Sequence, residues 1–534
     1  MHWSPESLAA AAGGTLLRRS ERAIAGAFID SRTPLVGGLF VPLVAARDGH
    51  DFIPAALAGG ASAVLLGPGR AAPEGDCTVV AVADPLVALQ ALARAARAGW
   101  SAPVVAVTGS NGKTTTRSMI DAVLRTRFER VLATRGNFNN HIGVPLSLLG
   151  GPERPDAAVL ELGMSAPGEN ALLGSIVRPD VAVITSVALE HLEFMGSLEA
   201  IAAAEAEVVP YLRPGGVVVL PADEPLLAPH VPAGLRALRF GAGPGTAVQI
   251  LGVEQDERTH VTLRLHHRAG GEEVRLGLAV FGAHNARNAA AALAVGLELG
   301  CAVPAMIEAL EQVLPVGDRG RVLRFDHHLL IADCYNANPG SVAAALQSLA
   351  GLRGRRPGPL VAVLGDMLEL GPTAPQLHAE AGRLAAELGI DALFGFGTLA
   401  QHATEAARAA GLAAWHAGES IEDLAAAIRA RFGALSGALL VKGSRGMRLE
   451  RVVAALRAAG AYVWIIGLPV DLLIGFQGKT ALVECKTRIG LRKPRPAKYT
   501  ALQTSFMRDW IGGTVATVTD AEGARRLLEV MRDK

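Results

Sequence analysis

The stretch "PVVAVTGSNGKTTT", residues 103–116, joins an apolar run of strand length to a glycine turn and then to a polar segment. The apolar run predicts a buried strand, and the segment after Gly112 predicts a helix. A glycine turn between a strand and a helix points backbone N–H groups at a ligand, and the helix dipole favours negative charge there. Gly109 and Gly112 would let the backbone approach a phosphate, and Lys113 would reach its outer oxygens. The stretch therefore predicts a phosphate-binding loop in an α/β domain.

This loop is shorter than the general phosphate-loop pattern, G-x-x-x-x-G-K-[ST], because Val107 stands where that pattern has its first glycine. The alternative interpretation, a tight turn with a solvated lysine, does not account for the strand before the loop and the helix after it. The hydroxyl that follows the lysine ligates Mg²⁺ in such loops, which assigns that role to Thr114. The predicted nucleotide-binding residues of the loop are Gly109, Ser110, Asn111, Gly112, Lys113, Thr114 and Thr115.

Strand and helix patterns alternate along the chain after the loop. Buried-type strands are predicted at 157–163, 181–187 and 215–223, and helix-length segments separate them. This alternation indicates a parallel sheet with helices on both faces. Residues 250–280 have the pattern of an antiparallel insert, and a third α/β unit begins near "LLIADCYNANPGS", residues 329–341.

The length of 534 residues is too great for one core and predicts three or four domains. The sequence patterns divide the chain at three points. We predict a small α/β domain over 1–84, a central parallel-sheet domain over 85–314 and a second large α/β domain over 315–460. Residues 461–534, the C-terminal segment, have their own short pattern of strands and helices.

Composition places the chain among folded proteins, since half of its residues are apolar and 19% are charged. The net charge of +1 argues against a protein that binds nucleic acid or a membrane surface along its whole length. Four scattered cysteines without a C-x-x-C pair indicate a reducing compartment and no zinc site. We see neither a signal peptide nor an apolar run long enough to span a membrane, so we expect a cytoplasmic protein.

Two polar residues stand where predicted strands end. Glu161 closes the strand "AAVLELG", and His191 follows the strand "VAVITSV". Open α/β sheets bind their ligands at the carboxyl ends of their strands, next to the phosphate loop. Glu161 is therefore a candidate ligand for Mg²⁺, while spacing alone supports His191 only weakly because Mg²⁺ prefers oxygen.

A series of motifs resembles the Mur ligases of peptidoglycan synthesis. The resemblance covers residues 1 to about 458, and "DSR", "LFV" and "DGHDF" near the N-terminus are similar to that family's uridine-nucleotide domain. "YNANP", "GDMLELG" and "KGSR" favour the branch of the family that adds D-alanyl-D-alanine. The larger motifs occur in the order "TGSNGKTTT", "GNFNNHIGVP", "ELGMSAPGE", "HNARNAAAA", "DCYNANPGS", "GDMLELG" and "VKGSRG".

The resemblance implies a three-domain α/β architecture: a small UDP-binding domain, a central ATP-binding domain and a Rossmann-like C-terminal ligase domain. It also implies an ATP- and Mg²⁺-dependent ligase, acting as a monomer, whose substrates are UDP-N-acetylmuramoyl-tripeptide and D-alanyl-D-alanine. A substrate carboxylate would take the γ-phosphoryl group of ATP, and the amine would displace phosphate from the acyl phosphate. Positioning and charge neutralisation would dominate such a reaction.

The resemblance also assigns roles to single residues. Lys113, Glu161, His191 and Glu205 would be catalytic, with Thr114, Glu161 and His191 around the metal. In addition to the loop, the nucleotide would contact Asn285, Asn288, Arg321, Asp333 and Asn336. The substrate-binding residues would be Asp30, Ser31, Arg32, Asp48, His50, Asn137, Asn140, Asn338, Lys442, Ser444 and Arg445.

Glu205 departs from the family pattern, because many relatives carry a lysine, carbamylated in several Mur ligases, at this place. A carbamylated lysine presents a carboxylate on a long stem, and Glu205 presents one on a shorter stem. Two hypotheses follow. Either Glu205 acts as the anion that organises the metal, directly or through water, or it is a solvated residue on the face of a helix.

The C-terminal segment resembles the PD-(D/E)XK nucleases, particularly their VRR-NUC-like members. Glu484 and Lys486 share one face of a predicted strand, and a hairpin would bring Asp471 alongside them. Such a group can hold Mg²⁺ and orient a water molecule. Gln503 matches a glutamine common in those enzymes, and the surrounding segment carries 12 Lys or Arg against 7 Asp or Glu, which suits nucleic acid. The alternatives are a basic surface extension or a degraded remnant, and a DNA-processing protein is the alternative function for the whole chain.

Overall fold

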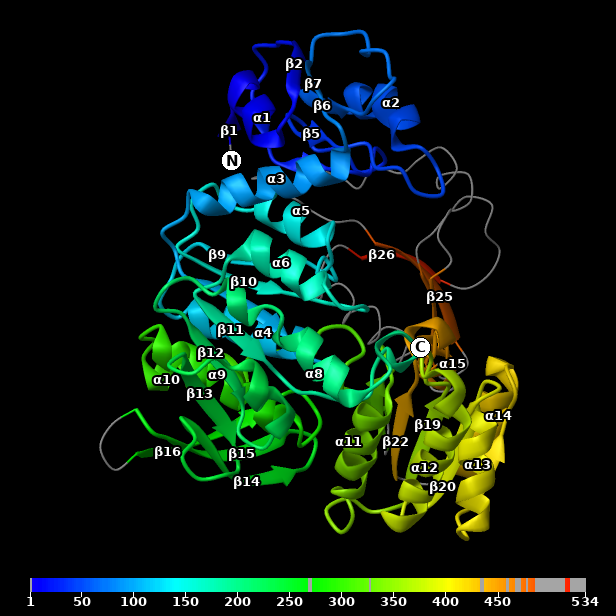
Figure 1. Cartoon of the computed structure of the whole chain (residues 1–534). Helices are drawn as coiled ribbons and strands as arrows, with labels where there is room; N and C mark the ends of the chain where they lie inside the picture. The colour runs from blue at the N-terminus through cyan, green and yellow to red at the C-terminus, as the bar shows by residue number, and fades with distance from the viewer. Residues whose placement is uncertain are drawn as a thin grey trace.

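The computed structural model describes residues 2–267, 271–325, 328–432 and 437–457, together with four strands of the C-terminal segment. Three sheets with their helices follow one another along residues 2–457. In Figure 1 the first lies at the top, the second extends from the middle to the lower left, and the third lies at the lower right; we call them the upper, middle and lower parts. Of the helices in this described part, none is long and apolar enough to cross a membrane.

The upper part is a small α/β lobe built on a mixed five-stranded sheet of order β2-β7-β6-β5-β4. Strands β4 to β7 pair in parallel, and β2 pairs antiparallel with β7 at the edge. The elements are β1 (His2–Trp3), α1 (Pro5–Ala12), β2 (Thr15–Arg18), β3 (Ile24–Ala25), β4 (Ala27–Phe28), β5 (Leu39–Phe40), α2 (Ile53–Ala58), β6 (Ala63–Leu66) and β7 (Thr78–Ala81).

Helix α3 (Pro85–Ala98) lies between this lobe and the middle part (Figure 1). It begins at Asp84, whose carboxylate accepts hydrogen bonds from the N–H groups of Leu86 and Val87, and Pro85 takes the first position, where no N–H is needed. Its apolar residues belong to a core that contains both α1 of the lobe and strands of the middle sheet. The helix therefore fixes how the lobe sits on the rest of the molecule.

The middle part is a nine-stranded sheet of order β16-β15-β14-β13-β12-β11-β8-β10-β9. Neighbouring residues of β8 face opposite cores: Ala106 packs with α3, α5 and α6, and Val107 packs with α4 and α9. Helices on both faces explain why these strands are continuous apolar runs. Its strands are β8 (Val104–Thr108), β9 (Val131–Ala133), β10 (Ala157–Glu161), β11 (Val181–Ile184), β12 (Val217–Pro221), β13 (Arg236–Gly241), β14 (Val248–Gln255), β15 (Thr259–Leu265) and β16 (Glu272–Leu278).

The pairing confirms the predicted parallel sheet, because neighbouring strands among β8 to β14 all pair in parallel. Strands β14, β15 and β16 form the expected antiparallel insert. The insert alternates buried and exposed residues in β15, as a half-buried strand does. The helices of this part are α4 (Lys113–Leu124), α5 (Gly143–Leu149), α6 (Glu169–Val177), α7 (Leu192–Met195), α8 (Leu198–Ala206), α9 (Asn285–Glu298) and α10 (Val303–Glu311).

The lower part is a six-stranded sheet of order β17-β18-β22-β19-β20-β21, parallel except for β17. Helices α11 to α13 cover one face, and α14 and α15 cover the other. The elements are β17 (Arg321–Phe325), β18 (His328–Asp333), α11 (Pro339–Ala350), β19 (Leu360–Gly365), α12 (Ala374–Glu387), β20 (Ala392–Phe396), α13 (Ala400–Ala409), β21 (Ala414–His416), α14 (Ile421–Phe432), β22 (Gly437–Lys442) and α15 (Glu450–Arg457).

In the C-terminal segment the structure describes β23 (Ala461–Ile465), β24 (Leu472–Phe476), β25 (Lys479–Cys485) and β26 (Thr514–Val518). They form a separate sheet in this order, in which β26 is parallel to β25 and the other pairs are antiparallel. Glu484 lies in β25, whereas Asp471, Lys486 and Gln503 lie outside the described residues.

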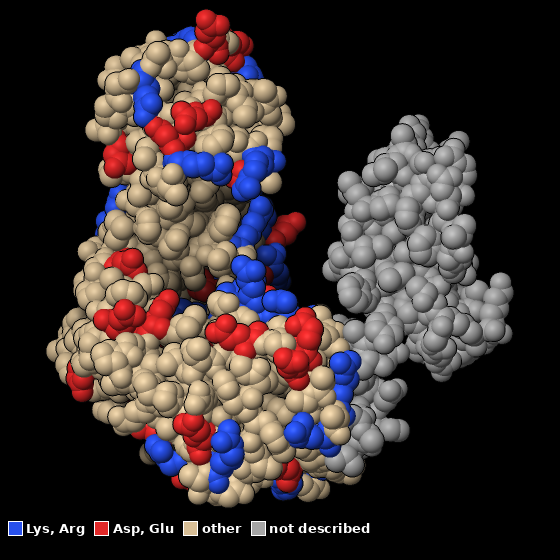
Figure 2. Space-filling model, turned by 90° about the vertical axis from the view of Figure 1, so that its right-hand side faces the viewer, with Lys and Arg blue, Asp and Glu red and all other residues tan. Residues whose placement is uncertain are grey.

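The carboxyl ends of β8, β10 and β11 lie side by side, since β8 pairs with both of the others. The phosphate loop, Glu161 and the segment that leads to His191 therefore meet at one edge of the middle sheet. Figure 2 shows the side of the molecule that lies on the right in Figure 1. A hollow lies there between the upper lobe and the wider lower part, with Lys and Arg side chains along its right-hand border.

Candidate active site

The loop between β8 and α4 needs its two glycines. Gly109 and Gly112 have φ angles of 120° and 87°, a region that other residues rarely adopt. A Cβ atom on Gly109 would overlap Thr185, and one on Gly112 would overlap the amide of Asn288. The backbone is thus bent and closely packed at both positions, which leaves the N–H groups at the start of α4 free to face an anion.

Lys113 lies folded over this loop. Its Nζ donates to the carbonyls of Gly109 and Ser110 at 2.6 and 3.2 Å and lies 3.5 Å from a carboxylate oxygen of Glu190. Burial would lower the pKa of Lys113, but the charges of Glu190 and the neighbouring glutamates outweigh it and raise that pKa. The ammonium group therefore stays charged where phosphates would bind.

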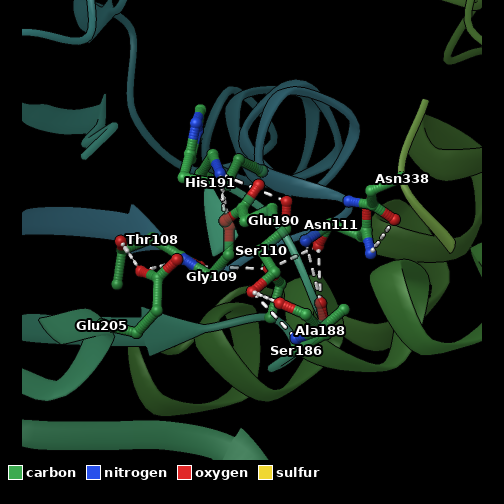
Figure 3. A network of polar contacts seen from close by, with 12 residues as sticks. Thr108, Gly109, Ser110, Asn111, Ser186, Ala188, Glu190, His191, Glu205 and Asn338 are labelled. Carbon is green, nitrogen blue, oxygen red and sulfur yellow. Dashed lines mark hydrogen bonds and ion pairs between the residues drawn. The ribbon is translucent and has the colours of Figure 1, made fainter. Parts of the chain in front are cut away.

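Glu190 is buried beside that lysine, with 6% of its surface exposed. Burial, opposed by the charge of Lys113 and assisted by the nearby charge of Glu205, raises the pKa of Glu190 to about 8. His191 lies next to Glu190 on the same side of the loop (Figure 3).

Glu161 ends β10 and is 3% exposed. Its Oε1 accepts hydrogen bonds from the Thr114 hydroxyl at 3.1 Å and from the amide of Asn139 at 3.0 Å. Its Oε2 is buried without a hydrogen-bond partner in the described residues, although Arg117 Nε lies 3.8 Å away. An unpartnered buried carboxylate oxygen beside a threonine hydroxyl fits the oxygen ligands that Mg²⁺ prefers.

Two asparagines of α9 support the loop from the other side. Asn288 accepts a hydrogen bond from the Thr116 hydroxyl at 3.1 Å and donates to Asn285 at 2.8 Å. Asn285 in turn donates to the carbonyl of Phe281 at 3.0 Å. Both asparagines are buried, so they hold α4 and α9 together while they border the cavity described below.

Glu205 lies on α8 and is completely buried. Its Oε2 accepts hydrogen bonds from the Thr108 hydroxyl and from the Gly109 N–H at 2.8 Å (Figure 3). It also accepts from the amide of Asn170 at 3.2 Å. Its Oε1 has no hydrogen-bond partner among the described residues. The hypothesis of a solvated helix residue is therefore wrong. Glu205 is buried and fixes the start of the phosphate loop by accepting hydrogen bonds from Thr108 and Gly109.

The lower part of the molecule reaches the loop through the start of α11. Asn338 caps that helix by accepting from the Ser341 N–H at 2.8 Å, and its amide faces the amide of Asn111 in the loop (Figure 3). The two amides exchange hydrogen bonds of 2.9 and 3.3 Å. Behind them, buried Lys442 donates to Asp333 at 2.8 Å and to the carbonyl of Asn336 at 3.0 Å.

A second contact joins the two parts at His191. Its Nδ1 meets the carboxylate of Glu369, which lies in the loop after β19, and the N–H of Glu193 donates to the Glu369 carbonyl at 3.2 Å. That loop is itself held in place, since His378 accepts from the Met367 N–H at 2.9 Å. A carboxylate on one ring nitrogen orients a histidine toward a metal on its other nitrogen.

These residues surround a cavity of about 590 Å³ between the middle and lower parts. Most of the predicted nucleotide and metal residues border it, as do Asn137, Asn140, Asn338 and Lys442 among the predicted substrate residues. The described residues contain no cluster of three or more His, Cys, Asp or Glu side chains that could hold a metal by itself. Phosphate oxygens and water would have to complete a Mg²⁺ site here, as is usual for this ion.

Several predicted site residues lie elsewhere. Arg321 pairs with Asp318 at 2.9 Å and does not border the cavity; Arg319, two residues earlier, borders it and stacks on Tyr335, with its guanidinium carbon 3.5 Å from the ring centre. Ser444 is buried against the 366–370 loop, and Arg445 is exposed near Tyr335.

The predicted uridine-binding residues form two small clusters in the upper lobe, apart from the cavity. Arg32 pairs with Asp30 at 2.7 Å, and its hydrogen bond lowers the pKa of Asp30 to about 2. In the second cluster Asp48 binds Nδ1 of His50 at 2.7 Å and also contacts Arg70. Ser31 lies on the exposed turn between Asp30 and Arg32.

Sequence reasoning missed some residues that border the cavity or hold its walls, namely Asn139, Glu190, His284, Arg319, Tyr335 and Glu369. Asn139 lies beside Asn140 in the motif "GNFNNHIGVP", and Glu190 directly precedes His191, so these two predicted residues could have pointed to their neighbours. Arg319 and Tyr335 are paired only by the fold, and no spacing in the sequence indicates their contact.

Comparison with known proteins identifies similar chains over most of this length. A model of the Mur ligase middle domain matches residues 107–296, and a model described as the Mur ligase, glutamate ligase domain matches residues 318–445. The UDP-N-acetylmuramoyl-tripeptide–D-alanyl-D-alanine ligase of Bacillus subtilis is 39% identical over 80% of this chain and 92% of its own. The ligase of the same name from Escherichia coli is 35% identical over 81% of this chain and 93% of its own.

Solved structures agree with these sequence matches. The crystal structure of MurF from Acinetobacter baumannii superposes with a TM-score of 0.77 at 30% identity, over 85% of this chain and 99% of that one. The MurF ligase of Thermotoga maritima in complex with ADP gives a TM-score of 0.71 at 29% identity, over 81% of this chain and 97% of that one.

Proposed function

The chain belongs to the Mur ligase family, and we infer that it catalyses the ATP-dependent joining of D-alanyl-D-alanine to UDP-N-acetylmuramoyl-tripeptide in peptidoglycan precursor synthesis. The observation that carries this inference is the cavity itself, where the phosphate loop faces Asp333, Asn338 and Lys442 of the lower part. The Bacillus subtilis and Escherichia coli relatives are ligases of this name, and this chain matches 92% and 93% of their length.

The proposed reaction has two steps, and their atoms balance without a redox partner. A carboxylate oxygen of the tripeptide attacks the γ-phosphorus of ATP, and ADP leaves. The amine of D-alanyl-D-alanine then attacks the acyl carbon, so an amide bond forms, phosphate departs with the former carboxylate oxygen, and the amine loses a proton. The protein's contribution is to position the reactants and to neutralise charge, which is the work of Lys113 and the loop N–H groups.

We propose that Mg²⁺ binds at Thr114 and Glu161, with His191 close by. The free Oε2 of Glu161 and the oxygen ligands around it support this proposal. When bound, the ion would neutralise negative charge on the phosphates. Glu369 orients the ring of His191, so its carboxylate would decide whether that ring reaches the metal.

For Glu205 we propose a positioning role: it holds the Gly109 N–H and the Thr108 hydroxyl, and its charge lies close to Lys113. The alternative is that its unpartnered Oε1 organises the metal through water. The two roles differ in what they require. Holding the loop needs a hydrogen-bond acceptor, whereas organising a metal needs a negative charge.

Glu205→Gln and Glu205→Ala separate the two roles. In the positioning role, Gln keeps turnover within a few fold, while Ala, which removes the acceptor of three hydrogen bonds, loses about tenfold or more. If Gln is as damaging as Ala and both raise the Mg²⁺ concentration needed for half-maximal rate, the metal-organising role is correct. Glu199→Ala, an exposed position on the same helix, is the matched control.

The remaining assignments are proposals that the sequence resemblance supports. We propose that the upper lobe, residues 1–84, binds the uridine nucleotide through the Asp30–Arg32 and Asp48–His50 clusters. Residues 85–314 would bind ATP and residues 315–460 would close over it. The three sheets lie within these ranges, and α15 buries its apolar residues Val452, Val453 and Leu456 in the lower sheet's core.

For the C-terminal segment we keep the proposal of a PD-(D/E)XK-like fold, supported by the predicted strands and by the parallel pairing of β26 with β25. The DNA-processing alternative is not favoured for the whole chain, because the relatives match about 80% of it as a ligase. A nuclease assay with Mg²⁺ on supercoiled DNA tests the segment. Cleavage lost in Glu484→Gln supports an active nuclease, and absence of cleavage in the unaltered chain contradicts it.

The proposed function is tested by phosphate release. The full-length chain with Mg²⁺ and ATP is given the UDP-linked tripeptide, D-alanyl-D-alanine, or both. We expect steady release only with both substrates, together with the pentapeptide product by mass spectrometry. Steady release stimulated by DNA, or release indifferent to the peptide substrates, contradicts the inference.

A further inference from the structure

A second cavity, of about 520 Å³, lies at the opposite edge of the middle sheet from the phosphate loop. It is bordered by the ends of α3 and α6 and by the turn that precedes β12. The strands β8, β11 and β12 all begin there, at Val104, Val181 and Val217. The residues around it are Arg94, Arg97, Ala98, Trp100, Ser175, Ile176, Arg178, Arg213 and Pro214.

Four of these nine residues are arginines, and none of the described residues that border the cavity is acidic. The one carboxylate nearby is shared: Arg97 lies 3.1 Å and Arg213 lies 3.6 Å from oxygens of Asp180. That carboxylate also accepts the Val104 N–H at 2.9 Å. Among the described residues, Asp180 is therefore the one carboxylate that forms ion pairs with any of these four arginines.

Arg97 has a structural task that accounts for its own position. It is 3% exposed, and it donates to the carbonyls of Val177 and Arg178 at 2.7 and 2.8 Å, where helix α6 ends. Burial, and then the charges of Arg213 and Arg178, lower the pKa of Arg97, while Asp180 opposes them. The other three arginines are not needed for this task.

Those three arginines keep most of their donors free. Arg94 makes a single described side-chain hydrogen bond, to Ser175 at 3.2 Å, and Arg213 has only its distant contact with Asp180. The Arg178 guanidinium has no ion pair or hydrogen bond with any described residue. Trp100, at the same cavity, is 5% exposed, and its indole N–H is buried without a partner in the described part of the chain.

We propose that this cavity binds an anion that carries two or more phosphate charges. Arginine guanidinium groups are suited to phosphate oxygens because they offer paired N–H donors in one plane. The indole N–H of Trp100 can only donate a hydrogen bond, and it has no acceptor among the described residues. It is therefore a further donor for an anion. The anion could be free in solution, such as pyrophosphate, or the headgroup of a phospholipid, and the chemistry of recognition is the same for both.

The site is connected through α3 to the upper lobe, and the link to substrate binding rests on the proposed function of that lobe. Arg94 and Arg97 lie in the last two turns of α3, the helix that packs against both the upper lobe and the middle sheet. A ligand that draws Arg94, Arg178 and Arg213 together would stabilise this end of α3. It would thereby restrain the lobe that we propose for the uridine nucleotide.

Titration of the full-length chain with pyrophosphate, without Mg²⁺, tests the proposal. Lys113→Ala weakens binding at the phosphate loop, and the loop N–H groups are then the same in every variant, so a difference between variants in this background reports the arginine cavity. In that background we expect Arg178→Gln with Arg213→Gln to weaken pyrophosphate binding about tenfold or more, because two charge-assisted contacts are lost. Arg236→Gln is the control, since Arg236 pairs with Glu298 in the same part of the molecule. The titration is followed by tryptophan fluorescence. If the change in fluorescence on adding pyrophosphate is lost in Trp100→Phe, that change comes from Trp100 at this cavity.

Vesicles of phosphatidylcholine with and without phosphatidic acid form the second arm. Binding of free pyrophosphate that the arginine variants weaken assigns the site to a soluble anion. Binding only to the acidic vesicles, again weakened by the variants, assigns it to a lipid headgroup. If neither probe distinguishes the arginine variants from Arg236→Gln, the proposal is wrong. Ligase activity of the Arg178 and Arg213 variants, measured with Lys113 intact, shows that the fold is kept.

Discussion

At the scale of single residues, Lys113 concentrates the electrostatics of the cavity, because three buried glutamates surround its ammonium group. Lys113→Ala removes the positive charge nearest to the phosphates. We expect turnover to fall by about a hundredfold or more, as when one preorganised donor is removed from other active sites. The measurement is initial rate with saturating substrates.

Arg130→Ala is the matched control, since Arg130 pairs with Asp156 on the surface of the same part of the molecule. It should leave turnover unchanged. Equal rates for Lys113→Ala and the unaltered chain would contradict the placement of the terminal phosphates at this loop.

His378 makes stability depend on pH. It is buried, donates from Nδ1 to the Ala374 carbonyl and accepts the Met367 N–H at Nε2, so only the neutral ring satisfies both bonds. Burial lowers the pKa of His378 below its ordinary value of 6.5. As the pH falls below 6.5, His378 therefore takes up a proton in the unfolded chain before it does so in the folded chain. The folded chain loses stability over the pH range between 6.5 and the lower pKa of His378 in the folded state.

We expect the unfolding free energy to decline below pH 6.5 with a contribution from His378 of up to about 1.4 kcal/mol per pH unit. Denaturant unfolding at several pH values measures this slope. His378→Gln, which does not titrate, should reduce the slope, whereas the exposed His266→Gln should not. An unchanged slope in His378→Gln would show that other groups cause the decline.

The loop residues were predictable because a strand, two glycines and a lysine form a local pattern. Contacts between distant segments were not: Glu205 meets Gly109 across 96 positions, and Asn111 meets Asn338 across 227. A pattern search sees Glu205 only as a charge on a helix, and only the fold shows that it is buried.

At the scale of elements, the start of α11 serves two purposes, since Asn338 both caps the helix and touches the phosphate loop. Asn338→Ala should lower the unfolding free energy by about 1 kcal/mol through loss of the cap. It should also raise the KM for ATP severalfold, because the contact with Asn111 disappears.

Ser341→Ala separates these purposes. Ser341 completes the capping box with Asn338 but makes no described hydrogen bond to Asn111. We expect it to destabilise the chain similarly while the KM for ATP stays the same. Equal KM values for the two variants would show that the contact between Asn111 and Asn338 does not matter for ATP.

Among the elements, the long buried strands were predictable as continuous apolar runs, as β12 and β19 illustrate. Short or half-exposed strands were not: β21 has three residues, and β17 carries Arg321 and Arg324. Such strands exist because a neighbouring strand pairs with them, and a single segment does not contain that information.

At the scale of the whole molecule, the residues that border the cavity lie between 110 and 442, and α15 completes the lower sheet's core before residue 458. A chain that ends at Arg457 should therefore fold and keep full ligase activity. Loss of activity in the shortened chain, with unfolding unchanged, would mean that the C-terminal segment takes part in ligation.

The order of the domains was predictable from motif order, while their contact across the cavity was not.

In the proposed mechanism the phosphate loop serves to activate a carboxylate, and transfer of oxygen from that carboxylate to phosphate is the measurement that examines this role. The UDP-linked tripeptide is prepared with heavy oxygen in its terminal carboxylate, and the phosphate released during ligation is analysed by mass. We expect one heavy oxygen in each phosphate released per pentapeptide formed, because the former carboxylate oxygen leaves with phosphorus. Pentapeptide formed with phosphate free of heavy oxygen would contradict it.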